Sequence, residues 1–384
     1  MAEYLKHGRQ TGFAVDEGVQ ARVAEMLAAI AERGESAVRE FSLTLDGHNP
    51  EHFRLDQGAI DEAVAQVDPG LRAHIDAAHA NVRAFAQAQL ATLSPLEVEI
   101  APGQVVGHRL VPVRSVGAYI PGGRYPLISS ALMSILTAKV AGVERVVAMT
   151  APTSTGGINP ATLYAMTVAG ADEIYALGGV QAMAAMAYGA LAGLEPVDMI
   201  VGAGNAFVAE AKRQLFGRVG IDLLAGPTEV LVIADESADP YTVAVDLLAQ
   251  AEHGPTSPAV LITTSRTLAE RALERIPEIL EGWSTGDVAG KAWQDLGVAV
   301  VVETDEEAVE LADAYASEHL QLQVSDLDWY LSRLRNYGSA FVGAETTVAY
   351  GDKAVGTNHT LPTNGAARYT GGLWVGSFIK VLTY

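Results

Sequence analysis

The sequence predicts an α/β protein with two Rossmann-like α/β/α units, each built on a parallel-rich sheet, and a helical segment in front of them. From about residue 100, short β-branched runs alternate with helical stretches, and the strands recur at intervals of roughly 25 residues. A second set of the same kind begins near residue 229. This alternation is typical of βαβ units, so we expect two similar α/β units.

The first hundred residues are predicted to be mainly helical. Their apolar residues recur at three- and four-residue intervals, which is the spacing of one helix face. The segments with this pattern are 19–33, 35–45, 58–66 and 71–93.

The first α/β set is predicted from residue 115 onward. Its expected strands are 115–120, 145–150, 173–177 and 198–201, and its expected helices are 127–141, 159–169, 181–191 and 206–215. Each strand ends at a turn rich in small residues.

The second set has the same order of elements. Its expected strands are 229–233, 259–264, 298–302 and 320–324, and its expected helices are 240–252, a stretch ending near 280, and 306–315. Residues 282–296 are expected to form a surface loop or a short helix.

Composition excludes several classes of function. A formal charge of −21 argues against binding nucleic acid or an anionic membrane, because both partners need a basic face. The chain has no cysteine, so any metal must use His, carboxylate or amide ligands. The first ten residues are too polar for a signal peptide, and no apolar run reaches the ~20 residues of a membrane span. We therefore expect a cytoplasmic enzyme.

An apolar helical run ends in Gln250 and His253, which lie three residues apart. On a helix this spacing places both side chains on one face, so an amide oxygen and an imidazole nitrogen could bind one cation. A histidine at a helix end is more often a capping or core residue, and the pair alone leaves both interpretations open.

Glu318 and His319 form a candidate acid/base pair, because a carboxylate can deprotonate water and an imidazole titrates near neutral pH. Their flanks are apolar or small, which favours an element boundary facing a cleft over a charged surface run. Asp352 and His359 lie in a Gly-, Thr- and Asn-rich segment that we expect to be a long loop, where site residues are common.

Three glycine-containing turns are candidate ligand sites. The turns at 178–181 and 202–205 each follow a strand and open a helix, so they are expected at the carboxyl edge of a sheet, where α/β proteins bind cofactors. Neither has the G-x-G-x-x-G pattern, and a plain tight turn is an equal alternative. The third turn, 121–126, contains Arg124. Arg124 is either a surface residue or a residue whose guanidinium group binds an anionic substrate group through two parallel hydrogen bonds.

The chain resembles the histidinol dehydrogenase family over nearly its whole length. The resemblance rests on eight blocks in the right order: VGAYIPGGRYP, AKVAGV, GGVQAMAAMAYG, GAGNAFVAEAKRQLFGRVGID, AGPTEVLVIAD, QAEHG, SEHLQLQ and GTNHTLPT. PGGRYP, GNAFVAEAKRQLFG and ARYTGGLWVG are more similar to the sulfopropanediol dehydrogenase branch than to true histidinol dehydrogenases.

The resemblance implies a zinc-dependent enzyme that oxidises a small primary alcohol to a carboxylate through an aldehyde, with two NAD used in succession. It also implies incomplete Rossmann-like domains that bind NAD without a G-x-G-x-x-G turn, and a homodimer. The substrate that the resemblance favours is 2,3-dihydroxypropane-1-sulfonate, which would be oxidised to sulfolactate. The alternative substrate is L-histidinol, which would be oxidised to L-histidine.

The same resemblance implies a role for each matching residue. The implied zinc ligands are Gln250, His253 and Asp352. Glu318 would activate water for attack on the aldehyde, and His319 would remove the alcohol proton. The implied substrate contacts are Ser129, Thr228, His359 and Arg124, and the implied NAD contacts are Tyr119, Gln181 and Asn205.

The implied domains are an N-terminal arm (1–15), a discontinuous α/β domain with the metal and catalytic residues (16–115 and 230–375), and an inserted NAD-binding domain (116–229). Residues 376–384 would begin a C-terminal dimerisation segment. In the family that segment delivers a Glu to the partner's substrate and a His to its zinc. No residue of this chain matches it, so we expect the 384-residue chain to fold but to bind zinc weakly.

Two other classes of function remain open at this stage. One is a non-catalytic ligand-binding homologue that keeps the fold and the crevice. The other is a zinc hydrolase in which Glu318 acts with a metal-bound water and without NAD.

Overall fold

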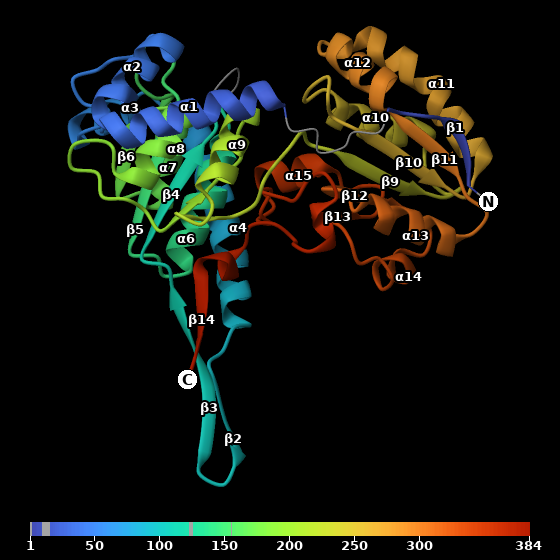
Figure 1. Ribbon diagram of the computed structural model, residues 1–384. Coiled ribbons are helices and arrows are strands. Elements are labelled where there is room, and N and C mark those ends of the chain that lie inside the picture. Colours follow the sequence, from blue (N-terminus) through green and yellow to red (C-terminus); the bar gives the residue numbers. More distant parts are fainter. Residues whose placement is uncertain (1, 10–15, 123–125, 155) are drawn as a thin grey trace. The chain divides into compact units, whose positions relative to one another are not determined.

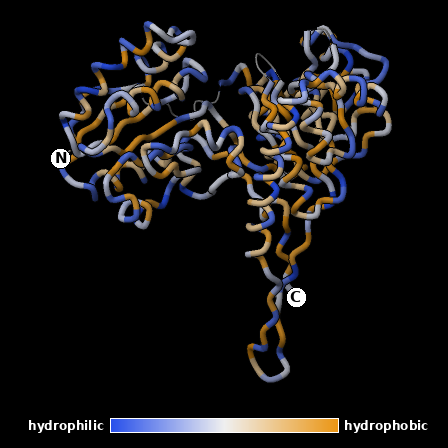
Figure 2. Tube along the Cα trace, turned by 180° about the vertical axis from the view of Figure 1, so that it is seen from behind, coloured by the Kyte–Doolittle hydropathy of each residue, from blue (hydrophilic) through white to orange (hydrophobic). Residues whose placement is uncertain are grey.

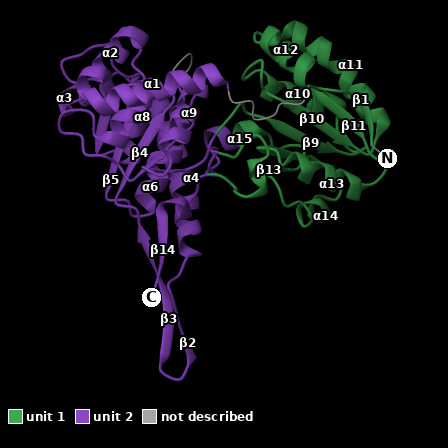
Figure 3. Ribbon diagram, viewed as in Figure 1, with its two compact units in different colours: residues 1–14, 225–350, 361–372 green, residues 15–224, 351–360, 373–384 purple. Residues whose placement is uncertain are grey.

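The computed structural model describes residues 2–9, 16–122, 126–154 and 156–384, and the chain forms two compact units (Figures 1 and 3). Unit 1 consists of Met1–Ala14, Ala225–Tyr350 and Leu361–Gly372. Unit 2 consists of Val15–Leu224, Gly351–Thr360 and Leu373–Tyr384. Each unit is a parallel-rich sheet covered by helices, so the predicted α/β class with two Rossmann-like units is confirmed.

Unit 1 contains a six-stranded sheet in the order β1-β11-β10-β9-β12-β13. Five strands are parallel, and β1 pairs antiparallel with β11 at one edge. Its strands are β1 (Glu3–Lys6), β9 (Val230–Ala234), β10 (Ala259–Thr263), β11 (Val298–Val301), β12 (His319–Gln323) and β13 (Ser339–Val342).

Helices cover both faces of this sheet. On β9, Val230 and Val232 pack with α10, α11 and α12, whereas Leu231 and Ile233 pack with α13 and α14 on the other face. This alternation follows from the two-residue period of a strand. The helices of unit 1 are α10 (Pro240–Ala251), α11 (Arg266–Gly282), α12 (Gly286–Leu296), α13 (Asp305–Tyr315) and α14 (Leu327–Leu331). The residues of α15 (Val348–Lys353) are assigned to unit 1 up to Tyr350 and to unit 2 from Gly351 onward.

Unit 2 contains a five-stranded, fully parallel sheet in the order β6-β5-β4-β7-β8. One face carries α1, α2, α8 and α9, and the other carries α3 to α7 (Figure 1). Its strands are β4 (Ser115–Ile120), β5 (Arg145–Thr150), β6 (Glu173–Ala176), β7 (Met199–Val201) and β8 (Gly220–Ile221). Its helices are α1 (Glu17–Arg33), α2 (Glu35–Asp46), α3 (Gln57–Ala65), α4 (Pro69–Ala91), α5 (Ile128–Ala131), α6 (Thr137–Val140), α7 (Pro160–Ala169), α8 (Gly179–Tyr188) and α9 (Ala206–Leu215).

A second, antiparallel sheet in unit 2 has the order β14-β3-β2. The hairpin of β2 (Leu96–Ala101) and β3 (Gln104–Pro112) extends away from the helices of this unit, and β14 (Ile379–Thr383) pairs with β3 (Figure 1). The hydropathy colouring in Figure 2 shows apolar residues along the hairpin. None of these three strands is predicted from the sequence.

Local sequence signals explain where the helices begin. Asp16, Asp56 and Asp68 accept hydrogen bonds from the first-turn backbone N–H groups of α1, α3 and α4, as an N-cap side chain does. In α7 and α10 a capping Asn159 or Asp239 precedes a proline at the first helical position, where no backbone N–H is needed.

The division into units differs from the predicted domains. Residues 16–115 are predicted to share a domain with 230–375, but all of them belong to unit 2 with the 116–224 segment. The reason is packing, because α1 lies against α8 and α9, and α4 lies against α6 and α7. Residues 282–296 contain the helix α12. In the described part of the chain, no helix combines the length and apolar character needed to cross a membrane.

Candidate active site

The candidate acid/base pair, Glu318 and His319, lies at the junction between the end of α13 and the start of β12. The chain leaves α13 through Ala316, a buried residue with a left-handed backbone (φ 50°), and Glu318 immediately precedes β12, which begins at His319. Both side chains are buried, and His319 Nδ1 lies 3.4 Å from Glu318 Oε2. The expected position at an element boundary is therefore observed.

A short hydrogen-bond chain connects Glu318 with the predicted ligand Gln250. Gln250 Nε2 donates to Thr228 Oγ1, and the Thr228 hydroxyl donates to Glu318 Oε2 over 2.5 Å. The backbone N–H of Glu229 donates to the same Glu318 oxygen over 3.1 Å. These donors favour the ionised carboxylate, which is the form that can act as a base.

The surroundings of His319 indicate which ring nitrogen is the base. Its Nδ1 lies 3.0 Å from the backbone carbonyl oxygen of Glu229. A carbonyl oxygen only accepts, so this hydrogen bond requires the proton on Nδ1. In the neutral imidazole the lone pair is then on Nε2, which is the atom able to take a proton from a substrate hydroxyl.

The two predicted metal ligands of unit 1 differ in setting. Gln250 is in the last turn of α10 and only 2% exposed, whereas His253 is exposed and lies in the turn after the helix ends at Ala251. The expectation that both lie on one helix is therefore wrong, because Glu252 is already the C-cap. Their backbones stay close, since His253 N donates to Gln250 O over 3.2 Å.

A side chain of β12 and the residue before α15 both hydrogen-bond to Asp246 of α10. Gln323 Nε2 donates to Asp246 Oδ2 over 2.7 Å, and Thr347 Oγ1 donates to Asp246 Oδ1 over 3.0 Å. Burial raises the pKa of Asp246, and these donors oppose the shift. The network positions the helix that carries Gln250.

In unit 2 the structure brings Ser129 and His359 together, although they are far apart in sequence. His359 Nε2 lies 3.0 Å from Ser129 Oγ. Burial lowers the pKa of His359, and the charge of Asp352 opposes that shift. Asp352 lies in the short helix α15 and not in the expected loop, whereas His359 is in the loop that follows.

Ser129 lies in α5, the first part of a helical stretch that is interrupted by a π-helical segment. The π-helical segment η1 (Leu132–Leu136) separates α5 from α6, and Asn358 Nδ2 donates to Met133 O within it over 2.9 Å. Such π segments are frequent at functional sites. Here the contact fixes the residue next to His359.

Two of the predicted NAD contacts lie at the carboxyl edge of the unit 2 sheet. Gly179 N donates to the Tyr119 hydroxyl over 3.2 Å, and Gln181 Nε2 donates to Asp46 Oδ2 over 2.8 Å. Gln181 is 1% exposed, and its Oε1 has no hydrogen-bond partner among the described residues. A buried, unsatisfied acceptor fits a ligand donor such as a carboxamide or a hydroxyl. Asp46 was not predicted, because nothing in the sequence places the end of α2 here.

Asn205 has a structural role that the alternative of a plain turn anticipated. Its Oδ1 accepts from Phe207 N and Val208 N, both over 3.1 Å, as the N-cap of α9. A Cβ on Gly202 (φ 116°) would lie 2.1 Å from Tyr119 O, so close strand packing requires glycine there. Neither contact excludes a ligand at the start of α9.

The predicted zinc donors are an amide oxygen, an imidazole nitrogen and a carboxylate, which suit zinc in a chain without cysteine. The Gln250 amide is oriented by Thr228, which leaves Oε1 as its ligand atom. Among the described residues, no three His, Asp or Glu side chains form a group that could hold a metal. Gln250 and His253 belong to unit 1 and Asp352 to unit 2. Arg124 lies outside the described residues.

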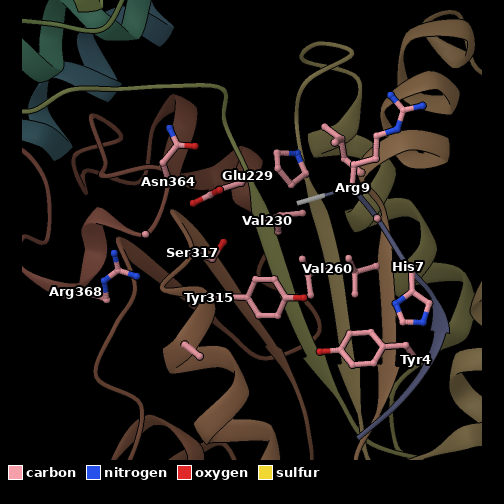
Figure 4. Close-up of a pocket in the computed structure, with 16 residues that line it drawn as sticks. Tyr4, His7, Arg9, Glu229, Val230, Val260, Tyr315, Ser317, Asn364 and Arg368 are labelled. Atoms are coloured by element: carbon pink, nitrogen blue, oxygen red, sulfur yellow. The ribbon is translucent and has the colours of Figure 1, made fainter. Parts of the chain in front are cut away.

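Glu229, which follows Thr228 directly, is a site residue that the sequence did not predict. Burial raises the pKa of Glu229 to about 7, against the opposing effect of backbone N–H donors from Glu318, Asn364 and Gly365. The side chain also lines a pocket of about 580 Å³ in unit 1 (Figure 4). The sequence contained one indication of this role, because Glu229 lies in the AGPTEVLVIAD block, one of those that carry the family resemblance.

Comparison with known proteins identifies the family. The histidinol dehydrogenase profile matches residues 10–384. The chain belongs to the histidinol dehydrogenase family. A histidinol dehydrogenase homolog from Shouchella clausii is 55% identical over 100% of this chain and 91% of its own length. A sulfopropanediol 3-dehydrogenase from Ruegeria pomeroyi is 46% identical over 100% of this chain and 88% of its own length.

A solved structure agrees with this assignment. The crystal structure of histidinol dehydrogenase from Elizabethkingia anophelis superposes with a TM-score of 0.92 at 35% identity, over 98% of this chain and 86% of that one. The family is one of NAD-dependent oxidoreductases that act on CH–OH groups and convert an alcohol to an acid in two steps. The predicted reaction type is therefore confirmed at the level of the family.

Proposed function

We propose that this protein oxidises a small primary alcohol to the carboxylate in two successive hydride transfers, with Glu318 and His319 as the proton-handling residues. The observation that carries the proposal is the arrangement of this pair. Two donors hold the Glu318 carboxylate, and a carbonyl holds Nδ1 of His319. One residue is thus set up as a carboxylate base and the other as an imidazole base at Nε2.

Each oxidation removes a hydride from carbon and a proton from oxygen. In the first step His319 takes the hydroxyl proton of the alcohol at Nε2, and an aldehyde results. In the second step Glu318 takes a proton from water, the water oxygen bonds to the aldehyde carbon, and the C=O bond pair moves to the aldehyde oxygen to give the hydrate anion. This anion loses a hydride to the acceptor and its hydroxyl proton to solvent, which gives the carboxylate. NAD, when bound, supplies the hydride acceptor, and zinc, when bound, supplies a Lewis acid for the substrate oxygen.

The proposed zinc ligands are Gln250, His253 and Asp352, and the proposed NAD contacts are Tyr119, Gln181 and Asn205. Support for the metal set comes from its N and O donors and from the orientation of the Gln250 amide. Support for the cofactor set comes from the unsatisfied Oε1 of Gln181. The proposed substrate contacts are Ser129, Thr228, His359 and Arg124.

The proposed substrate is 2,3-dihydroxypropane-1-sulfonate, and L-histidinol is the alternative. The PGGRYP, GNAFVAEAKRQLFG and ARYTGGLWVG segments support the sulfonate, as does similarity to a protein named sulfopropanediol 3-dehydrogenase. Similarity to a histidinol dehydrogenase of known structure supports the alternative. Arg124 would bind the sulfonate in a bidentate fork, which a cationic histidinol would not use.

NADH formation with histidinol, dihydroxypropanesulfonate and simple diols tests the function. A dehydrogenase of this type yields two NADH for each alcohol converted to acid. Metal-dependent hydrolysis without NAD would support the zinc hydrolase, and binding of an alcohol without turnover would support a non-catalytic homologue. Either result would contradict the proposal.

Substitution of Arg124 tests the substrate class. Arg124→Ala should raise KM for the sulfonate by about tenfold or more, because a charge-assisted pair is lost, and should leave KM for NAD unchanged. Arg109→Ala, a change to an arginine in β3, is the matched control. A rise confined to the KM for NAD would indicate that Arg124 serves the cofactor instead.

A further inference from the structure

Glu229 contacts both members of the candidate catalytic pair through three different atoms. Its Oε1 accepts from Glu318 N over 3.3 Å, and its own backbone N–H donates to Glu318 Oε2 over 3.1 Å. Its carbonyl oxygen lies 3.0 Å from His319 Nδ1 and accepts from His319 N over 3.3 Å. The pair and Glu229 therefore brace each other reciprocally across β9 and β12.

The carboxylate of Glu229 also holds a third segment of unit 1. It accepts from the backbone N–H groups of Asn364 and Gly365. Both residues have left-handed backbones, with φ of 54° and 73°. Successive N–H groups in such turns form a cradle for an anion. One side chain thus connects three segments that are far apart in sequence.

Glu229 is one of the residues that line the 580 Å³ pocket (Figure 4). The pocket lies at the amino edge of the unit 1 sheet, since Val230, Val260 and Val298 line it near the starts of their strands. Ionisable side chains from several parts of unit 1 line the pocket. They are Tyr4 from β1, His7 and Arg9 after β1, Tyr315 from α13 and Arg368 from η2 (Ala366–Arg368).

We propose that Glu229 is a positioning residue, which holds Glu318 and His319 in their working geometry through carboxylate-to-backbone hydrogen bonds. This inference rests on the proposed function for the role of the pair. The carboxylate accepts from three N–H donors, and an amide at this place would turn an N–H₂ group toward one of them. Loss of the contact displaces Glu318 N and loosens the link to the 364–365 turn.

The ionisation of Glu229 makes this role visible in a pH profile. Its pKa of about 7 lies within the usual assay range. Above that pH the ionised carboxylate accepts from all three donors. Below that pH the neutral carboxyl group is a weaker acceptor and carries an O–H that competes with the N–H donors around it. Turnover by the wild type should therefore fall as Glu229 becomes protonated, in addition to any effect of His319.

The experiment compares Glu229→Gln, Glu229→Asp and the control Glu281→Gln, an exposed residue in the same unit. kcat and both KM values are measured from about pH 6 to about pH 9. The resonance of the His319 ring is followed by NMR in protein with labelled histidine, and the His319→Asn variant assigns it. Thermal unfolding reports whether each variant folds.

In Glu229→Gln we expect kcat at high pH to fall by about 10- to 100-fold, as misplacement of a catalytic group does. The ionisation near neutral pH should disappear from its kcat profile, KM for NAD should stay within about twofold, and the His319 resonance should shift. Glu229→Asp keeps the charge on a shorter side chain, so its kcat should lie between those of Glu229→Gln and the wild type, with the ionisation retained.

The proposal would be overturned if Glu229→Gln had the same kcat, the same pH profile and the same His319 resonance as the wild type. If that variant does not fold, wild-type kinetics in Glu229→Asp would overturn it equally. Failure of the proposed function is a separate outcome. If wild-type protein oxidises no alcohol, the pair has another reaction, and the His319 resonance still shows whether Glu229 positions the ring.

Discussion

At the scale of single residues, the site depends on groups whose roles are set by one or two contacts. The Thr228 hydroxyl is one example, because it accepts from Gln250 and donates to Glu318. It therefore couples a proposed metal ligand to a proposed base, and each such contact can be tested by substitution.

Glu318→Gln should separate the two oxidations. The change removes the base for water but keeps the shape of the side chain, so oxidation of the aldehyde should slow by ~10² or more, while oxidation of the alcohol slows less. Single-turnover measurements started from the alcohol and from the aldehyde give the two rates. His319→Gln is the matched comparison and should damage the alcohol step. Equal loss of both half-reactions in Glu318→Gln would rule out separate roles.

His253→Ala should weaken zinc binding by at least about 10- to 100-fold, the loss typical of removing even a group that supports a ligand. Metal content after dialysis against a graded chelator, together with activity, measures the effect. His52→Ala removes another exposed histidine and should change neither. Full activity in verified metal-free wild-type protein would disprove a zinc requirement.

At the scale of elements, the position of Glu318 depends on how closely β12 and β13 approach. Ser339 N donates to Glu318 O over 2.9 Å, and Gly338 N donates to Ser317 O over 3.0 Å. A Cβ on Gly338 would lie 2.5 Å from the Glu318 carbonyl oxygen, which is backbone and cannot rotate away. Glycine at this strand start therefore permits the catalytic geometry.

Gly338→Ala should lower both stability and activity. Overpacking of this kind costs about 1–3 kcal/mol, and the displaced Glu318 should reduce kcat. Thermal unfolding and steady-state kinetics measure the two effects. Gly282→Ala is the control, because no described atom lies within 4 Å of its added Cβ. Unchanged kcat in a folded Gly338→Ala protein would show that the strand start does not control Glu318.

At the scale of the whole molecule, the antiparallel sheet of unit 2 carries an apolar face. Val98 pairs with Val106, and Val381 pairs with Leu110, so these side chains share one face with Leu96. Leu96, Val98, Val106 and Val381 are all exposed. Contiguous exposed apolar surface is typical of an interface, and we propose that a second copy of the chain covers it.

Sedimentation should therefore show a homodimer. Val98→Lys places a charge on the apolar face and should raise the dissociation constant of the dimer by about tenfold or more. Val105→Lys is the matched control, because Val105 pairs with Glu99 and lies on the opposite face. A monomeric wild type, or equal weakening by both substitutions, would contradict this role of the face.

The sequence by itself determined most of the helices and parallel strands, because their apolar periodicity and capping residues are local. It also determined the family, from ordered blocks that contain Glu318, His319 and Gln250. Tertiary structure alone decided which distant residues meet. The contacts of Glu229 with the 364–365 turn, of Gln181 with Asp46 and of His359 with Ser129 join segments that no local pattern connects. Tertiary packing also assigned residues 16–115 to unit 2, since α1 and α4 bury their apolar faces there.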